Sequence, residues 1–298
     1  MPASPPPPTL KPTTSRGPDI ALVCTYDEIA DRAQAVRALL IELDIRLHPG
    51  SALANMLREA ERVARDFRVG DPLHDPAGLI RTAHANRVAS AILDVGREPG
   101  ARECLRRMTG GGLDLSARGA SQDKDALWEI ELAARLRLHG LLVNFAEPDL
   151  VIDIAGTRYP IACKKVHSER GVEAQMRKGV KQLTAFGAPG LVAFDVSDLT
   201  PANSILVSPD SRVAGDHLAD LNRDFIDRNQ RRLDRYVADG RCHGVLVTTS
   251  VVADLQASSQ RLNNYSQATL WTLSPPHQPT SPAFHAIVAQ LQRNLAGG

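Results

Sequence analysis

The amino-acid sequence predicts an α/β protein, with a mixed sheet flanked by helices that follows a helical N-terminal module. Two observations carry this prediction. Apolar residues recur at helical spacing through most of the first hundred residues. From residue 123 onward the order becomes a helix, three strands, a helix and a strand, extended by one more helix and strand. Alternation of this kind indicates a mixed sheet with helices packed on it.

Size and composition are those of an ordinary globular protein. The chain has 298 residues, 43% of them hydrophobic and 23% charged, which suits one large domain or two modest ones. Its 35 Lys and Arg against 34 Asp and Glu leave a formal net charge of +1, so a nucleic-acid partner must be held by a local basic patch. No apolar run approaches the roughly 18 residues of a membrane helix, and we expect no membrane partner.

The spacing of the cysteines argues against two further classes of protein. Cys24, Cys104, Cys163 and Cys242 lie far apart and form no CxxC pair, so neither a zinc ribbon nor a disulfide framework is predicted. The N-terminus also lacks an apolar signal-peptide core. A reducing cytoplasm is the expected location.

The first 108 residues are predicted to be a tail and a helical module. Residues 1–18, rich in Pro, Ser and Thr, read as a disordered tail, and residues 19–108 as the module. Thr25 and Glu28 match a capping box at the start of its first helix. Two more helical patterns follow, one from Leu53 to Phe67 and one from Leu79 to Leu93.

A glycine-rich segment, residues 109–122, separates this module from the rest. The run Thr109–Gly112 is compatible with a phosphate-binding loop, but no Lys-Ser/Thr pair follows it and no strand clearly precedes it. A flexible linker is the favoured interpretation.

Residues 123–298 are predicted to form the second domain. A helix from Lys124 to His139 is followed by the strand LLVNF and by the strands DLVIDI and YPIACKKV, which form a hairpin. Next come a helix from Gly171 to Phe186, the strand LVAFDV, an Arg-rich helix over residues 214–237 and the strand GVLVTTS. A C-terminal helix completes the domain.

The richest chemical cluster lies on the hairpin. Asp149, after Glu147 and Pro148, opens one strand, and Lys164 lies near the end of the next. Side chains alternate along a strand, so Ile161, Cys163 and Lys165 are expected to point to one face and Lys164 to the functional edge. Mg²⁺ binds one or two carboxylates in sites that hydrolyse phosphodiesters, and a lysine there stabilises charge.

This arrangement resembles the PD-(D/E)XK nuclease superfamily, especially its restriction-endonuclease-like and Holliday-junction-resolvase-like branches. The resemblance is carried by a helix with WE and a Gly at its end, a strand, PD at the head of a hairpin, a Lys closing IACK, and a helix carrying KGVKQL. It covers about 130 residues and implies a restriction-endonuclease-like αβββαβ core. The implied activity is metal-dependent hydrolysis of nucleic acid, expected to be double-stranded DNA, with Mg²⁺ or Mn²⁺ as cofactor.

Four residues match the catalytic pattern of the superfamily. Asp149 matches the metal-binding aspartate and Lys164 the terminal lysine. Glu129 resembles the helix glutamate that many members add to the metal site, with Glu131 as the fallback. Gln182 resembles the glutamine that several branches carry on the following helix. Many relatives act as dimers to cut two strands, so a homodimer is compatible with the resemblance.

One position departs from the pattern. The acid expected two places before the lysine is replaced by Ala162, and taking Lys165 as the motif lysine gives Cys163 there instead. Glu129, Glu147 and Glu169 are candidates for a relocated acid. The departure leaves two functions open: a working nuclease, which we favour, and a catalytically degenerate module that binds DNA or a protein partner.

Basic residues gather after the hairpin. The candidate contacts to a phosphate backbone are Lys165, Arg177, Lys178 and Lys181. Few aromatics accompany them, so stacking of single-stranded bases is not indicated.

Two other chemistries are compatible with the residue types but not with their spacing. Cys163 with His167 as a nucleophile and base is disfavoured, since Cys163 is expected to face the core. Zinc binding by Cys163, His167, Cys242 and His243 lacks paired spacings.

Overall fold

The structure, a computed structural model, describes residues 12–22, 24–70, 75–154, 156–259, 262–273 and 281–293. The described strands are β1 Pro12–Leu22, β2 Leu142–Ala146, β3 Asp149–Ile154, β4 Thr157–Lys165, β5 Leu191–Asp195, β6 Ile205–Ser208, β7 Gly244–Leu255 and β8 Leu262–Leu273. The helices are α1 Tyr26–Glu42, α2 Ala52–Arg68, α3 Pro76–Val95, α4 Ala101–Met108, α5 Gln122–Leu138, α6 Val172–Phe186, α7 Ser211–Ala238 and α8 Pro282–Arg293. Two short 3₁₀ helices, η1 Glu169–Gly171 and η2 Ser197–Leu199, complete the elements.

The strands form one mixed sheet, which confirms the α/β class and the mixed sheet predicted from the sequence. Its order is β1-β8-β7-β5-β4-β3-β2, with β6 beside β7. The central pairs β4–β5 and β5–β7 are parallel, while β2–β3, β3–β4, β7–β8 and β1–β8 are antiparallel. The elements α5, β2, β3, β4, α6 and β5 follow one another in the predicted order.

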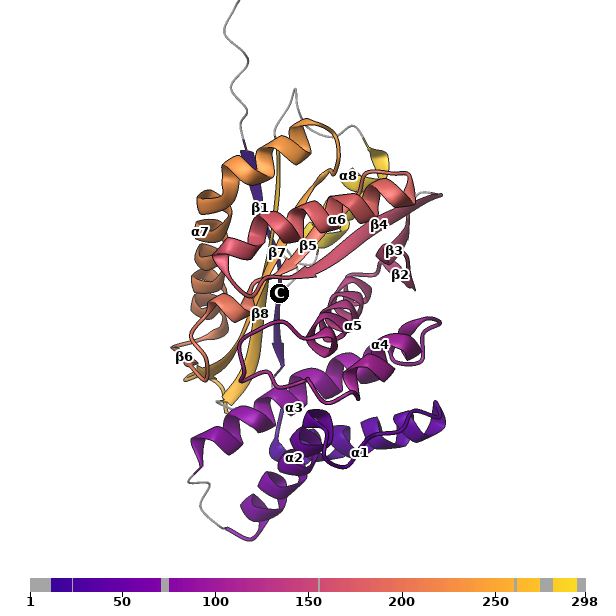
Figure 1. The fold of residues 1–298 in the computed structure, drawn as a ribbon. Coiled ribbons are helices and arrows are strands. Elements are labelled where there is room, and N and C mark those ends of the chain that lie inside the picture. The colour runs from indigo at the N-terminus through magenta and orange to yellow at the C-terminus, as the bar shows by residue number, and fades with distance from the viewer. Residues whose placement is uncertain are drawn as a thin grey trace, which may run out of the picture.

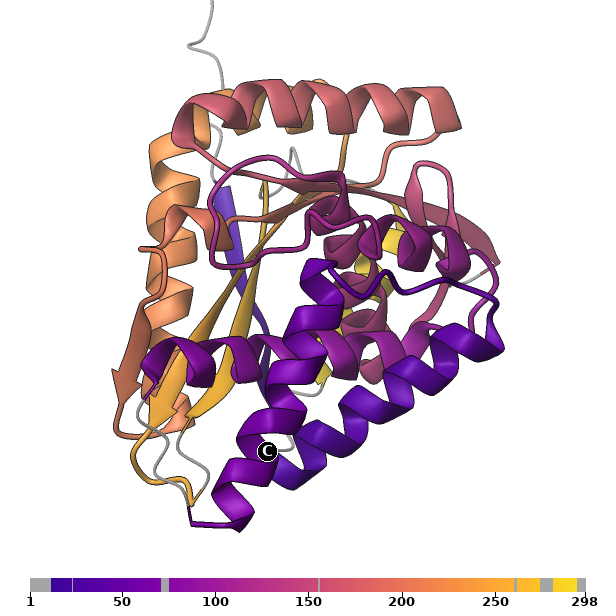
Figure 2. The same cartoon turned by 60° about the horizontal axis from the view of Figure 1, so that its bottom comes forward.

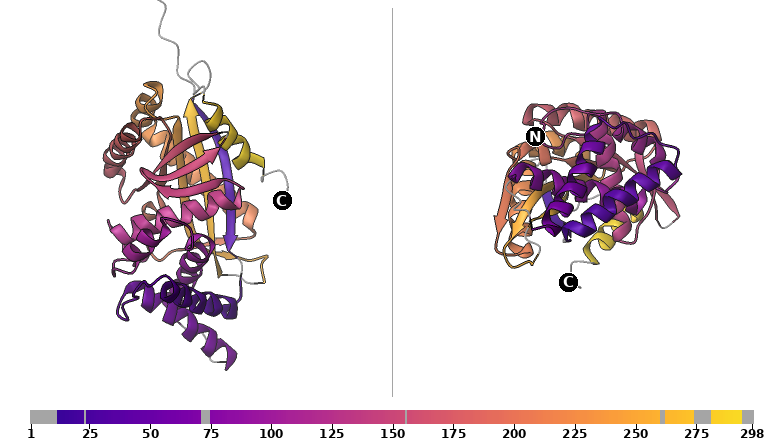
Figure 3. Two further views of the ribbon diagram at one scale, coloured as in Figure 1. Left: turned by 90° about the vertical axis from the view of Figure 1, so that its right-hand side faces the viewer. Right: turned by 90° about the horizontal axis from the view of Figure 1, so that it is seen from below.

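Helices cover both faces of this sheet (Figure 1). One face packs against α6 and α7 through Ala162, Val192 and Phe194. The other carries Ile161 and Ala193, in a core shared with α5 and α8. Successive residues of β4 and β5 thus enter opposite cores, as expected for strands buried on both sides. Figure 3 shows α8 lying along the sheet on the side away from α6.

The N-terminal helical prediction is confirmed from α1 onward, with one helix more than the three predicted. The capping box of Thr25 and Glu28 is present, and the short helix α4 was not predicted. Helix α3 lies between the pair α1–α2 and the sheet, where it packs on α5 and β8 (Figures 1 and 2). Residues of α1–α4 share one continuous hydrophobic core with α5 and β4, so the helical region is not a separately packed module.

Two segments differ from their predicted structure. Residues 12–18, assigned to the disordered tail, and residues 19–22 of the predicted helical module belong to β1, which pairs with β8 through residues 12–16 and 19–22. Residues 1–11 lie outside the described residues. The segment 109–122, predicted to be a linker, is anchored to the hydrophobic core. Leu113 is fully buried in the core, and Gly112 bonds through its N–H to Asp123 and through its carbonyl to Ser121, the N-cap of α5.

The sequence analysis did not predict the strands β1, β6 and β8. The C-terminal helix is present as α8. No described helix combines the length and apolarity that crossing a membrane requires.

Candidate functional site

A cavity of about 530 Å³ brings the predicted catalytic residues together. Helices α4, α5 and α6 and the strands β3 and β4 supply its walls, with α5 and α6 on opposite sides of β4 (Figure 1). The lining residues that carry charge or an amide are Arg107, Asp125, Glu129, Asp149, Lys164, Lys165, Gln175, Lys178, Lys181 and Gln182. All four residues predicted to be catalytic are among them.

Asp149 and Lys164 meet where β3 and β4 separate. The ladder between these strands ends at the pair Leu150–Ile161, and β4 continues beside β5 alone. The N–H of Cys163 is thereby released from the ladder and donates to Oδ2 of Asp149 at 2.7 Å. Lys164 Nζ donates to the same oxygen at 2.9 Å. The carboxylate therefore has a fixed position at the mouth of the hairpin.

Gln182 closes the site from α6. Its Nε2 atom donates to the carbonyl of Pro148 at 3.0 Å and lies 3.3 Å from Oδ1 of Asp149. Its Oε1 atom is buried and has no hydrogen-bond partner among the described residues. Lys178 and Lys181 share this helix face, because residues three and four apart on a helix are neighbours.

Glu129 forms the opposite wall from α5. Its side chain is 11% exposed, and Oε2 accepts hydrogen bonds from Arg107 at 2.7 Å and from Cys104 Sγ at 3.1 Å. Burial raises the pKa of Glu129, and the Arg107 hydrogen bond opposes that rise. The fallback residue Glu131 lies elsewhere, in a buried ion pair with Arg87.

Ala162, which stands where the resemblance predicts an acid, lies in a tightly packed layer. Ala162 is fully buried in the layer between β4 and α6, and a Cβ atom at Gly179 would lie 3.5 Å from its methyl carbon. Of the three glutamates considered for a relocated acid, only Glu129 lines the cavity. Glu147 is exposed outside it, and Glu169 bonds to Arg228 and Asn229 of α7.

The four predicted backbone contacts divide into three groups. Lys178 and Lys181 are exposed and line the cavity. Arg177 is exposed outside the lining. Lys165 corrects the prediction, because it is only 5% exposed and its ammonium group pairs with Asp195 and Asp198. A buried, paired lysine is not a surface contact for nucleic acid.

The thiol and zinc alternatives fail on geometry. Cys163 is buried, and burial raises the pKa of its thiol well above the usual value, while His167 bonds to Asp198 at 2.7 Å. Cys163 and Cys242 belong to different cores on opposite faces of the sheet. Within the described residues, no group of three or more His, Cys, Asp or Glu is arranged to hold a metal ion.

Sequence reasoning missed two charged residues of the cavity, Asp125 and Arg107. Asp125 lies one turn before Glu129 on α5, and the spacing of four was a usable signal for a shared helix face. Arg107 comes from α4, and no local pattern announces its contact with Glu129. With it the lining holds five basic residues and three carboxylates, and because Lys165 is paired with Asp195 outside the cavity, four cations face three carboxylates.

The arrangement can hold an anionic ligand, and its three carboxylates can face a cation. Comparison of the chain with protein-family models, with curated proteins and with solved structures finds no match.

Proposed function

We propose that the protein is a metal-dependent nuclease that hydrolyses phosphodiester bonds of nucleic acid, with double-stranded DNA as the expected substrate. The proposal rests on the meeting of Asp149, Lys164 and Gln182, which come from β3, β4 and α6. These are the residues and elements that the PD-(D/E)XK resemblance pairs. Glu129 completes the set from α5.

The side chains present fit Mg²⁺ or Mn²⁺ as a cofactor. Asp149 and Glu129 are hard oxygen donors, and Mg²⁺ commonly takes only one or two carboxylates besides water and phosphate oxygens. The unpartnered Oε1 atom of Gln182 is a further oxygen at the same wall. Such an ion supplies neutralisation of the charge that develops on the phosphate.

Side chains of the protein contact the substrate phosphates and position Asp149. Lys164, anchored on Asp149, presents an ammonium group to a scissile phosphate and stabilises its charge. Lys178 and Lys181 are placed to contact neighbouring phosphates. Gln182 holds Asp149 through Nε2 and so fixes the carboxylate that would bind the metal.

A second function is a nuclease-like module that binds DNA without cutting it. One observation favours it: both candidate metal ligands already have cationic partners, Lys164 for Asp149 and Arg107 for Glu129. A divalent cation must compete with those groups. The buried Ala162 also leaves the site one carboxylate short of the superfamily pattern.

Cleavage of plasmid DNA by the purified protein, with Mg²⁺ or Mn²⁺ and with EDTA, separates the two functions. The variant Asp149→Asn keeps an acceptor for the Cys163 N–H but loses the charge. Asp153→Asn is the matched control, because Asp153 lies on the same strand, exposed and bonded to Asn144. We expect metal-dependent cleavage by the wild type and Asp153→Asn only. Salt-sensitive DNA binding without cleavage by any of them would support the binding module.

A homodimer that places two such cavities on opposite strands is part of the nuclease proposal. Light scattering with and without duplex DNA measures the mass of the assembly. If the protein is a monomer that nicks the plasmid and never linearises it, the result would argue against the homodimer.

A further inference from the structure

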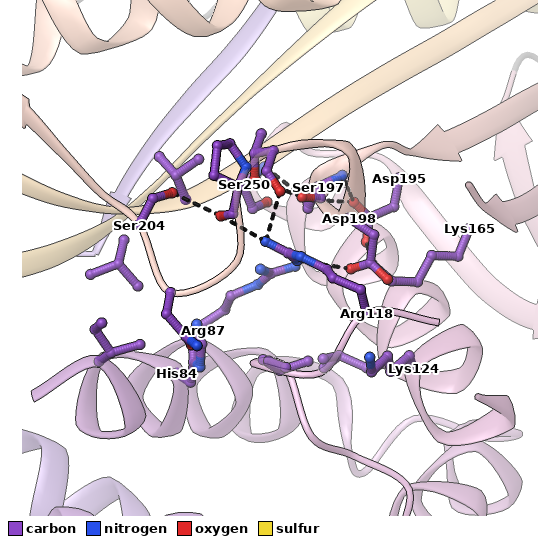
Figure 4. Close-up of a pocket in the computed structure, with 18 residues that line it drawn as sticks. His84, Arg87, Arg118, Lys124, Lys165, Asp195, Ser197, Asp198, Ser204 and Ser250 are labelled. Atoms are coloured by element: carbon purple, nitrogen blue, oxygen red, sulfur yellow. Dashed lines mark hydrogen bonds and ion pairs between the residues drawn. The ribbon is translucent and has the colours of Figure 1, made fainter. Parts of the chain in front are cut away.

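A second polar cavity lies where β4 and β5 end, on the side of the sheet that faces α3 and α5 (Figure 4). Its volume is about 40 Å³. Charged and hydroxyl groups dominate its lining: Arg87, Arg118, Lys124, Lys165, Asp195, Ser197, Asp198, Ser204 and Ser250. Helix α3, helix α5, the loop before α5 and the segment after β5 all contribute.

The carboxylates at this cavity are already paired. Lys165 pairs with Asp195, and Arg118 lies 3.2 Å from Asp198. Arg87 pairs through two hydrogen bonds with Glu131, which lies outside the lining. Three carboxylates and three of the four cations therefore neutralise one another.

Lys124 is the remaining cation. It is 3% exposed, its Nζ atom donates to the carbonyl of Ala117, and no carboxylate of the described residues lies within 4.0 Å of it. A buried ammonium group without a direct ion pair is costly, and the more distant charge of Asp198 offsets that cost only in part. Burial accordingly lowers the pKa of Lys124. An anion in the cavity would remove this cost.

The other groups of the cavity suit an oxyanion. Ser250 brings a hydroxyl group that accepts hydrogen bonds from Arg135 and Ser266 and keeps its own proton for a ligand. Ser197 and Ser204 already donate theirs, to Asp195 and to the carbonyl of Pro201. Arg118, 30% exposed, reaches across the cavity to the carbonyls of Thr200 and Pro201 and forms part of its wall (Figure 4). One water needs about 10–15 Å³ of such space, so the cavity has room for a group that replaces a few waters.

We propose that this cavity binds a tetrahedral oxyanion of phosphate size, with Lys124 as its principal counter-charge and Arg118 at its entrance. Two sources share this chemistry: inorganic phosphate and the terminal phosphate of a nucleic-acid strand. The proposal does not depend on nuclease activity, because binding is measured without metal or cleavage.

Calorimetric titration with inorganic phosphate at constant ionic strength tests the site. We compare the wild type with Lys124→Met, which removes the charge and keeps the length of the side chain, and with Arg223→Met, which removes an exposed cation of α7 outside both cavities. We expect phosphate affinity at least about tenfold weaker in Lys124→Met and unchanged in Arg223→Met. Absence of binding by the wild type, or undiminished binding by Lys124→Met, would overturn the proposal.

Two additions keep the test decisive. Should Lys124→Met fail to fold, Arg118→Gln at the entrance serves instead, with the same expected weakening. Competition with short oligonucleotides then distinguishes the sources. Displacement of phosphate by a 5′-phosphorylated strand but not by its 5′-hydroxyl counterpart supports a strand end as the ligand, and displacement by neither supports free phosphate. Equal displacement by both would contradict the proposal, since an internal phosphodiester does not enter so small a cavity.

Discussion

Lys164 and Asp149 form an ion pair of 2.9 Å at the point where β3 and β4 part, with side chains only 12% and 14% exposed. The same carboxylate oxygen accepts the N–H of Cys163. Asp149 is therefore held from the backbone as well as from the lysine, and its position does not depend on Lys164 alone.

This relationship predicts the behaviour of Lys164→Met. The variant keeps Asp149 in place and removes its competing cation, so Mn²⁺ affinity measured by calorimetry should be equal or tighter. Cleavage of plasmid DNA should fall by about 10²–10³, the usual effect of removing a charge-stabilising donor. Weaker Mn²⁺ binding would show that Lys164 orders the carboxylate and that the backbone contact is insufficient.

Lys178 and Lys181 should set the salt dependence of DNA binding. Each phosphate contact contributes about 0.9 to the slope of log affinity against log salt concentration, so Lys178→Ala with Lys181→Ala should lower the slope by nearly 2. Arg177→Ala, on the same helix but outside the cavity lining, is the control and should change the slope little. Fluorescence anisotropy at several salt concentrations measures all three. Equal effects of the control and the double variant would place the DNA elsewhere.

Glu131 should matter for folding and not for chemistry. Its partner Arg87 is buried, and removing one member of a buried ion pair typically costs about 3–5 kcal/mol. Glu131→Gln should therefore lose stability of this order in urea unfolding. Glu129→Gln should lose less, because its partner Arg107 is 32% exposed. If Glu131→Gln is as stable as the wild type but does not cleave DNA, the metal ligand would be Glu131 and not Glu129.

Stability should fall as the pH drops below neutrality, in part through His84. Burial, with the charge of Arg87, lowers the pKa of His84 to about 4. The unfolded chain then binds a proton near pH 6.5 and the folded chain only near pH 4, so this contribution is complete above about pH 6.5 and is lost as the pH falls toward 4. Because the residue is partly exposed, we expect about 1–2 kcal/mol from it.

Urea unfolding at pH 7 and pH 4.5 measures this effect. His84→Gln should lose less stability between the two pH values than the wild type does. The exposed His217 on α7 provides the control, and His217→Gln should behave as the wild type. An unchanged pH dependence in His84→Gln would exclude His84 as a source.

Local patterns were enough to predict the elements around Asp149, and they failed where long-range pairing decides the structure. The hairpin, α5 and α6 show clear periods of two and 3.6 residues. Strand β8 hides its period because buried polar residues interrupt it: Asn264 bonds to a carbonyl of α3, and Gln267 bonds to Asn222 of α7. Those partners lie 181 and 45 residues away in the sequence.

In the candidate site, too, local patterns predicted some positions and missed those that depend on tertiary contacts. Strand alternation correctly separated Lys164 from the core-facing Ile161 and Cys163, and it also pointed Lys165 inward, where the structure buries it. Treating Lys165 as a backbone contact ignored that alternation. Arg107 reaches Glu129 because α4 packs on α5, a tertiary contact that no spacing reveals.

Strand β1 has a practical consequence for anyone who shortens the chain. Its composition invites removal of the first two dozen residues, yet β1 pairs along β8 from Pro12 to Leu22. Removing it would expose the unpaired N–H and carbonyl groups of a twelve-residue strand, which other chains can use as a template. A protein that begins at Thr25 should therefore self-associate or precipitate while the full chain stays dispersed, and size-exclusion chromatography of the two would show the difference.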